Sequence, residues 1–384
     1  MYFLERVSDQ LKSLAGFAVV AKLTAILAAI RNTQLDGWRA FAVLGVIWLH
    51  WAPKEWRGPF PFEIGLFFFL TLTGFLITRI LLREKKLCEN LECEGASRGW
   101  RGKAYIAFQK RRMLRILLPC YVAMIFAIMV GAPDISAHPW IYAGHLSNFH
   151  MAYMERWPSG TAHYWTLALQ IQFYLFWPIL VFWVPQKSLV YVFGAIVALA
   201  PLGRMMMENY SPQIYHSEAL PFVSCDYFAV GAILALAMER GMAAGNFRLK
   251  WLALAALGGY TILYVFNERG QKISGLCFIQ QTLVAIAFAG LISATLAGFS
   301  GILGRVLDHP FVQEIGRLSF GLYLFHTLVP LFLGWIMPFL WHPFFSGPWV
   351  ILRLIAFALT SWGFAILCLK YLEGRSQLPK QQKI

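Results

Sequence analysis

Long apolar runs, each close in length to a bilayer-spanning helix, follow one another along most of the chain. The hydrocarbon core of a membrane needs about 20 mostly apolar residues per helix. The predicted fold class is therefore all-α, a polytopic transmembrane helical bundle of about ten spans. We expect the spans at residues 37–53, 64–82, 113–131, 163–184, 188–207, 219–238, 250–266, 276–299, 314–338 and 346–371.

The distribution of basic residues indicates the topology. Nine Lys and Arg side chains lie between Arg83 and Arg112, so we expect this segment in the cytoplasm. If residues 140–150 crossed the membrane, the later basic loop with Arg240 and Arg248 would lie outside, together with the Lys380–Lys383 tail. We therefore expect an interfacial or re-entrant segment at 140–150 and both termini in the cytoplasm.

The N-terminal apolar run, Leu14–Ile30, is interrupted by Lys22 and followed by Arg31. We favour a helix lying on the cytoplasmic membrane surface, and an eleventh span remains the alternative. The predicted organisation is an N-terminal helix at 1–32, a transmembrane domain at 33–375 and a cytoplasmic tail at 376–384.

Composition agrees with a membrane protein and argues against two other classes. The chain is 59% hydrophobic and 14% charged, whereas soluble domains are about half apolar and a quarter charged. Its net charge of +14 lies mostly in short loops, which favours topology signals over nucleic-acid binding. Four of the six cysteines fall in apolar runs and two in the basic segment, so we expect neither a metal site nor a disulfide.

The first span carries charged and titratable side chains, which are costly inside a bilayer. Arg39 and His50 are eleven residues apart, so at about 100° per residue they share one helix face, separated by a rise of about 16 Å. Asp36 lies on the same face and can pair with Arg39. Snorkelling explains Arg39 alone, but the shared stripe favours a functional role for His50.

A second basic pair, Arg112 and Arg115, is spaced i, i+3 at the expected start of the third span. The planar guanidinium fork is suited to phosphate. Spacing alone nevertheless favours simple anchoring at the cytoplasmic interface.

Further polar side chains occur within or beside the expected spans, where helix packing and interhelical hydrogen bonding are the alternatives to function. Ser319, Tyr323 and His326 form one stripe in the ninth span. The full set of possible cavity-lining residues is Glu63, Thr73, His163, Trp165, Gln170, Tyr174, Ser319, Tyr323 and His326.

Taken in order, these segments resemble the acyltransferase 3 family of membrane acyltransferases. The similar stretches are LDGWRAFAVLGVIWLH, GLFFFLTLTGFLIT, KRRMLRILLP, HYWTLALQIQFYLFWP, IGRLSFGLYLFH and the final YLEGR, together covering residues 33–375. The chain departs from the family pattern in three details. Thr73 replaces the usual Ser, one extra residue precedes Pro119, and the closing motif lacks its proline.

The resemblance implies a membrane core that moves an acyl group, usually acetyl, from acyl-CoA to a carbohydrate hydroxyl. His50 would be the catalytic base or acyl relay, and Asp36 and Arg39 would complete the catalytic set. Arg112 and Arg115 would bind the donor. The expected partners are acyl-CoA, a glycan and the bilayer of a bacterial cytoplasmic (inner) membrane, with acyl-CoA a co-substrate and no bound cofactor.

One position departs from the family pattern. Gln170 stands where the family has an acidic residue, so a carboxylate that could orient a histidine is absent there. Either Asp36 or Glu63 substitutes, or the acidic residue is not the base, or the substrate is unusual. The alternative functions are a catalytically silent member and a transporter or flippase. Transport is disfavoured because the two halves of the sequence show no repeat.

Overall fold

The computed structural model describes residues 32–93, 99–211, 213–270, 276–341 and 349–373, and every regular element in these ranges is a helix. The long helices are α2 (Thr33–Trp51), α4 (Ile64–Cys93), α5 (Trp100–Met129), α9 (Tyr164–Trp183), α10 (Leu189–Tyr210), α11 (Pro221–Glu239), α12 (Phe247–Glu268), α13 (Gln280–Ala297), α15 (Pro310–Phe325) and α17 (Val350–Leu367). The all-α prediction is confirmed.

Shorter helices connect the long ones. They are α3 (Lys54–Arg57), α6 (Pro133–Ala137), α7 (Pro139–Ala143), α8 (Ser147–Ala152), η1 (Ser217–Ala219), η2 (Cys277–Ile279), α14 (Gly301–Leu307), α16 (Leu328–Ile336), η3 (Pro338–Trp341) and the π-helical turn η5 (Cys368–Glu373). Stretch 140–150 falls on α7 and α8, which are too short to cross a bilayer. The Leu14–Ile30 run lies outside the described residues.

Eight helices in the described ranges are long and apolar enough to cross a membrane, or nine if the bent pair α15 and α16 counts as one span. The first predicted span, α2, is not among them, because Asp36, Arg39 and His50 reduce its apolar character. Each of the ten predicted spans nevertheless overlaps a long helix. The polytopic bundle is therefore as expected, and its first helix is the most polar.

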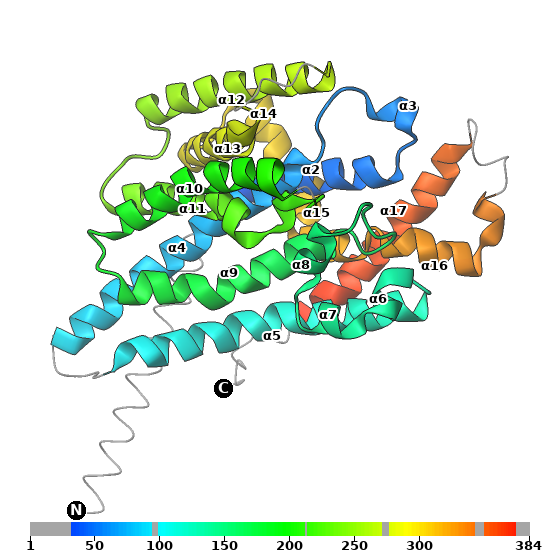
Figure 1. Cartoon of the computed structure of the whole chain (residues 1–384), viewed down its shortest axis with the longest axis horizontal. Coiled ribbons are helices and arrows are strands. Elements are labelled where there is room, and N and C mark those ends of the chain that lie inside the picture. The colour runs from blue at the N-terminus through cyan, green and yellow to red at the C-terminus, as the bar shows by residue number, and fades with distance from the viewer. Residues whose placement is uncertain (1–31, 94–98, 212, 271–275, 342–348, 374–384) are drawn as a thin grey trace, which may run out of the picture.

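The helices form one bundle in which α4, α5, α9 and α11 run along the long axis (Figure 1). We call the end where α4 leads into α5 the basic end, and the end carrying α3 and α6 to α8 the histidine end. Helix α4 packs most extensively on α11, while α2 packs on α15. Through this second contact, the polar stripes predicted on α2 and α15 face each other.

The predicted basic loop is mostly helical, which corrects the expected boundaries at the basic end. Helix α4 continues to Cys93 and α5 begins at Trp100, because the Lys, Arg, Glu and Leu residues there favour helix. The Lys85 ammonium donates to the carbonyls of Val181 and Val184 at 3.0 and 2.6 Å, at the C-terminus of α9. The extension of α4 therefore holds the end of α9.

Helices α4 and α11 approach each other closely through glycine. A Cβ at Gly74 would lie 2.2 Å from the Phe228 carbonyl oxygen, and one at Gly231 would lie 2.1 Å from that of Thr71. No larger side chain fits at either position without moving the backbone. Small residues at such contacts allow membrane helices to pack tightly, because lipid supplies no hydrophobic force between them.

A sharp bend of 66° separates α15 from α16 immediately after His326. Pro330 lies four residues beyond His326, lacks an amide hydrogen and would clash with that residue's carbonyl in a straight helix. The freed carbonyl instead accepts a hydrogen bond from Trp51 Nε1 at 2.8 Å. The proline therefore ties the bend in α15 to the end of α2.

A buried ion pair joins α10 to α11. Arg204 Nη2 lies 2.7 Å from Asp226 Oδ2, and their side chains are 4% and 0% exposed. Thr282 donates to the same carboxylate at 2.5 Å. A buried charge that loses its partner is strongly destabilising.

We expect Asp226→Asn to lower the free energy of unfolding by about 3–5 kcal/mol, because Arg204 would stay buried without its counter-charge. Thermal unfolding of the purified protein in detergent measures the loss. The double variant Arg204→Met with Asp226→Leu removes both charges, so it should be less destabilised than Asp226→Asn. Equal stability of Asp226→Asn and the wild type would show that the pair is not needed.

Candidate active site

A polar cavity of about 260 Å³ lies among α2, α4, α5, α9 and α15, and we call it the arginine cavity. It is lined by eight of the side chains singled out from the sequence: Arg39, Thr73, Arg112, Arg115, Gln170, Tyr174, Ser319 and Tyr323. Thr166, Glu373 and apolar side chains of α4, α5, α9 and α15 complete the wall. Residues from five separate sequence segments therefore meet in one site.

Arg39 is held at this cavity by partners on two helices. Its Nη1 lies 2.9 Å from Asp36 Oδ1, which confirms the pair expected from spacing, and its Nη2 donates to Ser319 Oγ at 2.9 Å. The carboxylate fixes the guanidinium from α2 and the hydroxyl fixes it from α15. Such a held guanidinium presents its charge to the cavity without paying rotamer entropy on binding an anion.

Arg112 approaches the cavity from α5. Its Nη2 donates to Tyr174 Oη at 3.3 Å, and the guanidinium lies over the Tyr174 ring, 5.0 Å from the centroid. Its Nε is buried and has no hydrogen-bond partner within the described part of the chain. Arg112 therefore holds a donor that the described part of the chain does not use.

Arg115 forms an ion pair that the sequence analysis missed. Its Nη2 lies 3.3 Å from Oε2 of Glu373, a carboxylate that is 4% exposed. Glu373 belongs to the YLEGR segment. The resemblance of this segment to the family's closing motif was the one sequence feature that could have identified Glu373 as a site residue. The π-helical turn η5 brings this residue back beside α5 and the arginine cavity.

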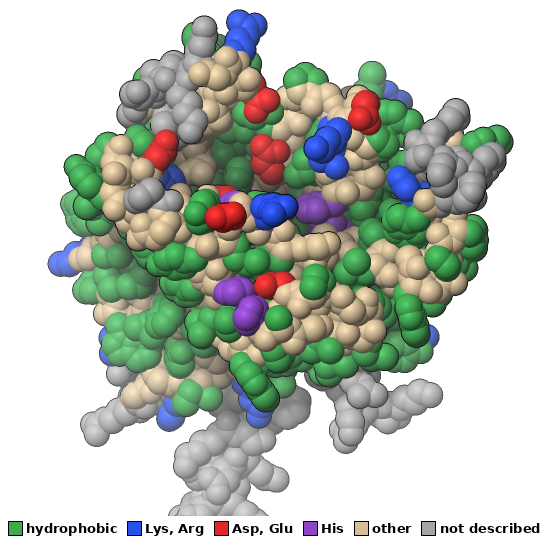
Figure 2. All heavy atoms as spheres, turned by 45° about the vertical axis from the view of Figure 1, so that its right-hand side comes forward, with side chains coloured by type: hydrophobic (Ala, Val, Ile, Leu, Met, Phe, Trp, Pro, Cys, Tyr) green, Lys and Arg blue, Asp and Glu red, His purple; other side chains and the backbone are tan. Residues whose placement is uncertain are grey.

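A cluster of three histidines, His50, His163 and His326, lies toward the histidine end. The ring centroids of His50 and His326 are 4.8 Å apart, and those of His163 and His326 are 5.2 Å apart. His163 and His326 are buried, whereas His50 is exposed. Figure 2 shows this end of the molecule, whose surface is hollowed between charged and histidine side chains.

The hydrogen bond of His50 determines where its proton sits. Its Nδ1 lies 2.8 Å from the carbonyl oxygen of Val46. A carbonyl only accepts, so Nδ1 carries the hydrogen, and the neutral ring keeps its lone pair on Nε2. His50 is thus arranged to accept a proton at Nε2, the requirement for a general base.

Tyr323 connects the arginine cavity with the histidine cluster. It lines the cavity, its hydroxyl lies 2.5 Å from Thr166 Oγ1, and its ring centroid lies 5.4 Å from that of His326. Tyr323 and Thr166 therefore close the cavity on the side of the histidines. The rings of Tyr323, His326 and His50 follow one another, with the centroids of His326 and His50 4.8 Å apart.

Two predicted residues lie outside both groups. Trp165 packs against Trp157, with ring centroids 6.0 Å apart. Glu63 precedes α4, and its pKa is raised by burial and further by the charge of Glu268 at the end of α12. Neither lines the arginine cavity.

The prediction that Asp36 could replace the missing family carboxylate as the partner of His50 is wrong. Asp36 is fourteen residues away on the same helix, about 21 Å along its axis, and it pairs with Arg39. Gln170 lines the arginine cavity, as predicted, and donates to Thr73 and Tyr174 at 3.3 and 2.9 Å. An acidic residue at position 170 would therefore act on the arginines.

Comparison with known proteins adds the family. Residues 32–369 match the model of the acyltransferase 3 family, described as an acyltransferase domain. A similar protein is the peptidoglycan O-acetyltransferase OatA of Listeria monocytogenes, 27% identical over 330 residues, 76% of this chain and 48% of the relative. The putative peptidoglycan O-acetyltransferase YrhL of Bacillus subtilis is 27% identical over 324 residues, 76% of this chain and 47% of the relative.

The O-acetyltransferase OatA of Staphylococcus aureus is 23% identical over 336 residues, 78% of this chain and 51% of the relative. The chain thus spans about half the length of the curated relatives it matches. No solved structure matches. The family model covers most of the chain, including the three arginines of the cavity and the histidine cluster, so this protein belongs to the acyltransferase 3 family.

Proposed function

We propose that this protein transfers an acetyl group from acetyl-CoA to a hydroxyl of a glycan, such as a surface polysaccharide, a lipid-linked sugar or an oligosaccharide. The observation that carries the proposal is the pairing of α2 with α15. The pair holds Arg39 and Ser319 at one end, and His50 and His326 at the other. An anion-binding site and a proton acceptor are thereby connected through one helix pair.

The arginine cavity supports a phosphate-bearing donor. Arg39, Arg112 and Arg115 converge on it, and two carboxylates, Asp36 and Glu373, offset only part of their charge. At about 260 Å³ it is slightly smaller than the roughly 300–1,000 Å³ typical of drug-sized ligands. A whole CoA would not fit, so we place only the pantetheine arm and its adjoining phosphate there, with the nucleotide toward the basic end.

The chemistry assigned to His50 follows from its free Nε2. As the hydroxyl oxygen attacks the thioester carbonyl carbon, Nε2 takes the hydroxyl proton. The new C–O bond forms, the C–S bond breaks, and the proton passes to the leaving thiolate. In the alternative relay, Nε2 attacks the thioester carbon and the thiolate leaves. The hydroxyl oxygen then attacks the acetyl carbon, the C–N bond to Nε2 breaks, and the hydroxyl proton passes to the thiolate by way of solvent.

The names of the relatives support the acceptor class, because they include two peptidoglycan O-acetyltransferases, one of them putative. The predicted topology would place the basic end in the cytoplasm, where acetyl-CoA is made, and the histidine end on the opposite side of a bacterial cytoplasmic membrane. Transfer would then move the acetyl group along the α2–α15 pair toward an acceptor outside.

The proposal is tested with purified protein in lipid vesicles supplied with acetyl-labelled acetyl-CoA and soluble peptidoglycan fragments. We expect protein-dependent release of the CoA thiol and labelled fragments. Vesicles that instead move the fragments across the bilayer without acetyl-CoA would favour the transporter alternative. The absence of both thiol release and donor binding would indicate a catalytically silent member.

A further inference from the structure

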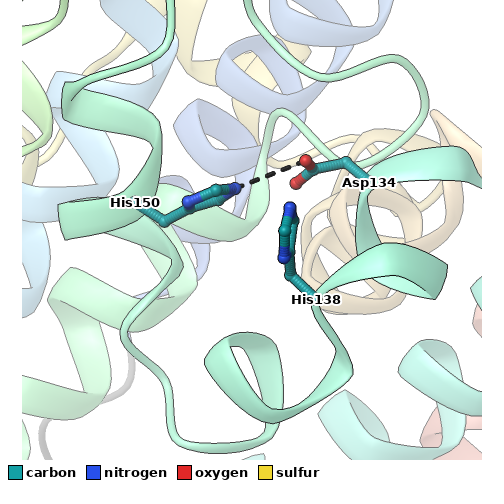
Figure 3. Close-up of side chains that lie close together, drawn as sticks. All are labelled: Asp134, His138 and His150. Carbon is teal, nitrogen blue, oxygen red and sulfur yellow. Dashed lines mark hydrogen bonds and ion pairs between the residues drawn. The ribbon is translucent and has the colours of Figure 1, made fainter.

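A group of metal-binding side chains lies at the histidine end, outside the arginine cavity and the histidine cluster. Asp134, His138 and His150 each offer one ligand atom, and these atoms all lie within 4.8 Å of one another. Figure 3 shows the two imidazole rings directed toward the carboxylate, with His150 Nε2 at 3.3 Å from Asp134 Oδ1. The three residues come from the segment between α5 and α9.

Short helices place these side chains. Asp134 lies in the first turn of α6, and His138 follows it by one turn, with the His138 amide donating to the Asp134 carbonyl at 2.9 Å. His150 approaches from α8. Asp134 and His150 are half-buried, while His138 is exposed, so the group opens to solvent.

A buried tyrosine orients the carboxylate. The Tyr142 hydroxyl donates to Asp134 Oδ2, and it also lies 3.1 Å from Thr161 Oγ1. Metal-binding carboxylates are commonly held by an outer hydrogen bond of this kind.

We propose that Asp134, His138 and His150 bind a divalent transition-metal ion, with zinc as the best match. Ligand bonds of about 2.0–2.1 Å in a tetrahedron separate the ligand atoms by roughly 3.4 Å. The His150–Asp134 distance of 3.3 Å already has this value, and the exposed His138 needs only a small movement. Two imidazoles disfavour Mg²⁺ and Ca²⁺, which take oxygen ligands.

Binding requires a lone pair on Nε2 of His150. That nitrogen now faces a carboxylate oxygen, which only accepts, and therefore carries the ring hydrogen. When the ion binds, this hydrogen moves by way of solvent to Nδ1, so the ring stays neutral and Nε2 and the carboxylate each give a lone pair to the ion. Three protein ligands leave a fourth position for water.

The site is connected to the histidine cluster through hydrogen bonds. Tyr142 contacts Thr161, and the carbonyl of the preceding Gly160 accepts from Thr327 Oγ1 at 2.7 Å. Thr327 Oγ1 also lies 2.8 Å from His163 Nδ1. A bound ion would therefore fix the segment between α5 and α9 against the elements that hold His163, which is a positioning role.

Zinc binding to the purified full chain, carried on an affinity tag without histidine, tests the proposal. We expect about one Zn²⁺ per chain by elemental analysis and calorimetry, an upward shift of the unfolding temperature, and no displacement by excess Mg²⁺. His138→Ala and His150→Ala should each weaken zinc binding at least tenfold. His138 is exposed, so its removal leaves the packing intact.

His216→Ala is the matched control, because His216 also stands beside a carboxylate, with Nδ1 3.4 Å from Glu218 Oε1. It should bind zinc like the wild type. The proposal is overturned if the wild type binds no stoichiometric zinc. It is equally overturned if the folded double variant His138→Ala/His150→Ala keeps the wild-type affinity, or if His216→Ala loses it.

Discussion

His50→Ala is expected to reduce acetyl transfer by about 10²- to 10⁴-fold, the usual contribution of a positioned general base. The reason is the single free lone pair on Nε2, which is fixed there by the bond from Nδ1 to the Val46 carbonyl. If His50 is instead the acyl relay, no intermediate can form and the loss is at least as large. Label transfer to peptidoglycan fragments and release of CoA thiol measure the change.

The structure also predicts what His50→Ala leaves unchanged. The side chain is exposed, so its removal creates no buried cavity, and the unfolding temperature and donor binding should stay close to wild type. His216→Ala removes another imidazole at the histidine end and should retain activity. Full activity of folded His50→Ala would exclude both roles and would move the search for the base to His326, whose Nε2 is buried without a partner among the described residues.

Much of the site could be predicted from sequence because helical periodicity is a local property. The Asp36–Arg39 pair and the stripe of Ser319, Tyr323 and His326 each depend only on spacing within one helix. The stripes proved to face each other, with Arg39 on Ser319 and His50 beside His326. Polar stripes inside a bundle have few other places to go, since lipid cannot satisfy them.

Other features depend on contacts between distant segments, which spacing does not encode. Glu373 reaches Arg115 across 258 positions, through a π-helical turn that no local pattern indicated. Position 170 could be recognised as unusual, but only the packing of α9 shows that it faces the arginines. The group of Asp134, His138 and His150 is not encoded in spacing either, because it forms only where short helices fold back on one another.

The second large effect is expected from the arginine cavity. We expect Arg112→Gln to raise the KM for acetyl-CoA about tenfold or more, since hydrogen bonds to a charged group are each worth about 1.5–3 kcal/mol. Arg112 is a better test position than Arg115, because its partner Tyr174 carries no charge that the substitution would leave unpaired. Replacing Arg115 leaves Glu373 buried without its ion pair, so Arg115→Lys is preferable to Arg115→Gln.

The competing explanation, anchoring by positive charge at the cytoplasmic face, makes a different prediction for a matched pair. Arg248 and Lys250 are exposed basic residues that do not line the cavity. If anchoring alone matters, both double variants should act by lowering the expression level. Arg248→Gln/Lys250→Gln should then lower it as much as Arg112→Gln/Arg115→Lys. If the cavity binds phosphate, only the second pair weakens donor binding in purified protein, and the weakening becomes smaller as salt screens the wild-type contacts.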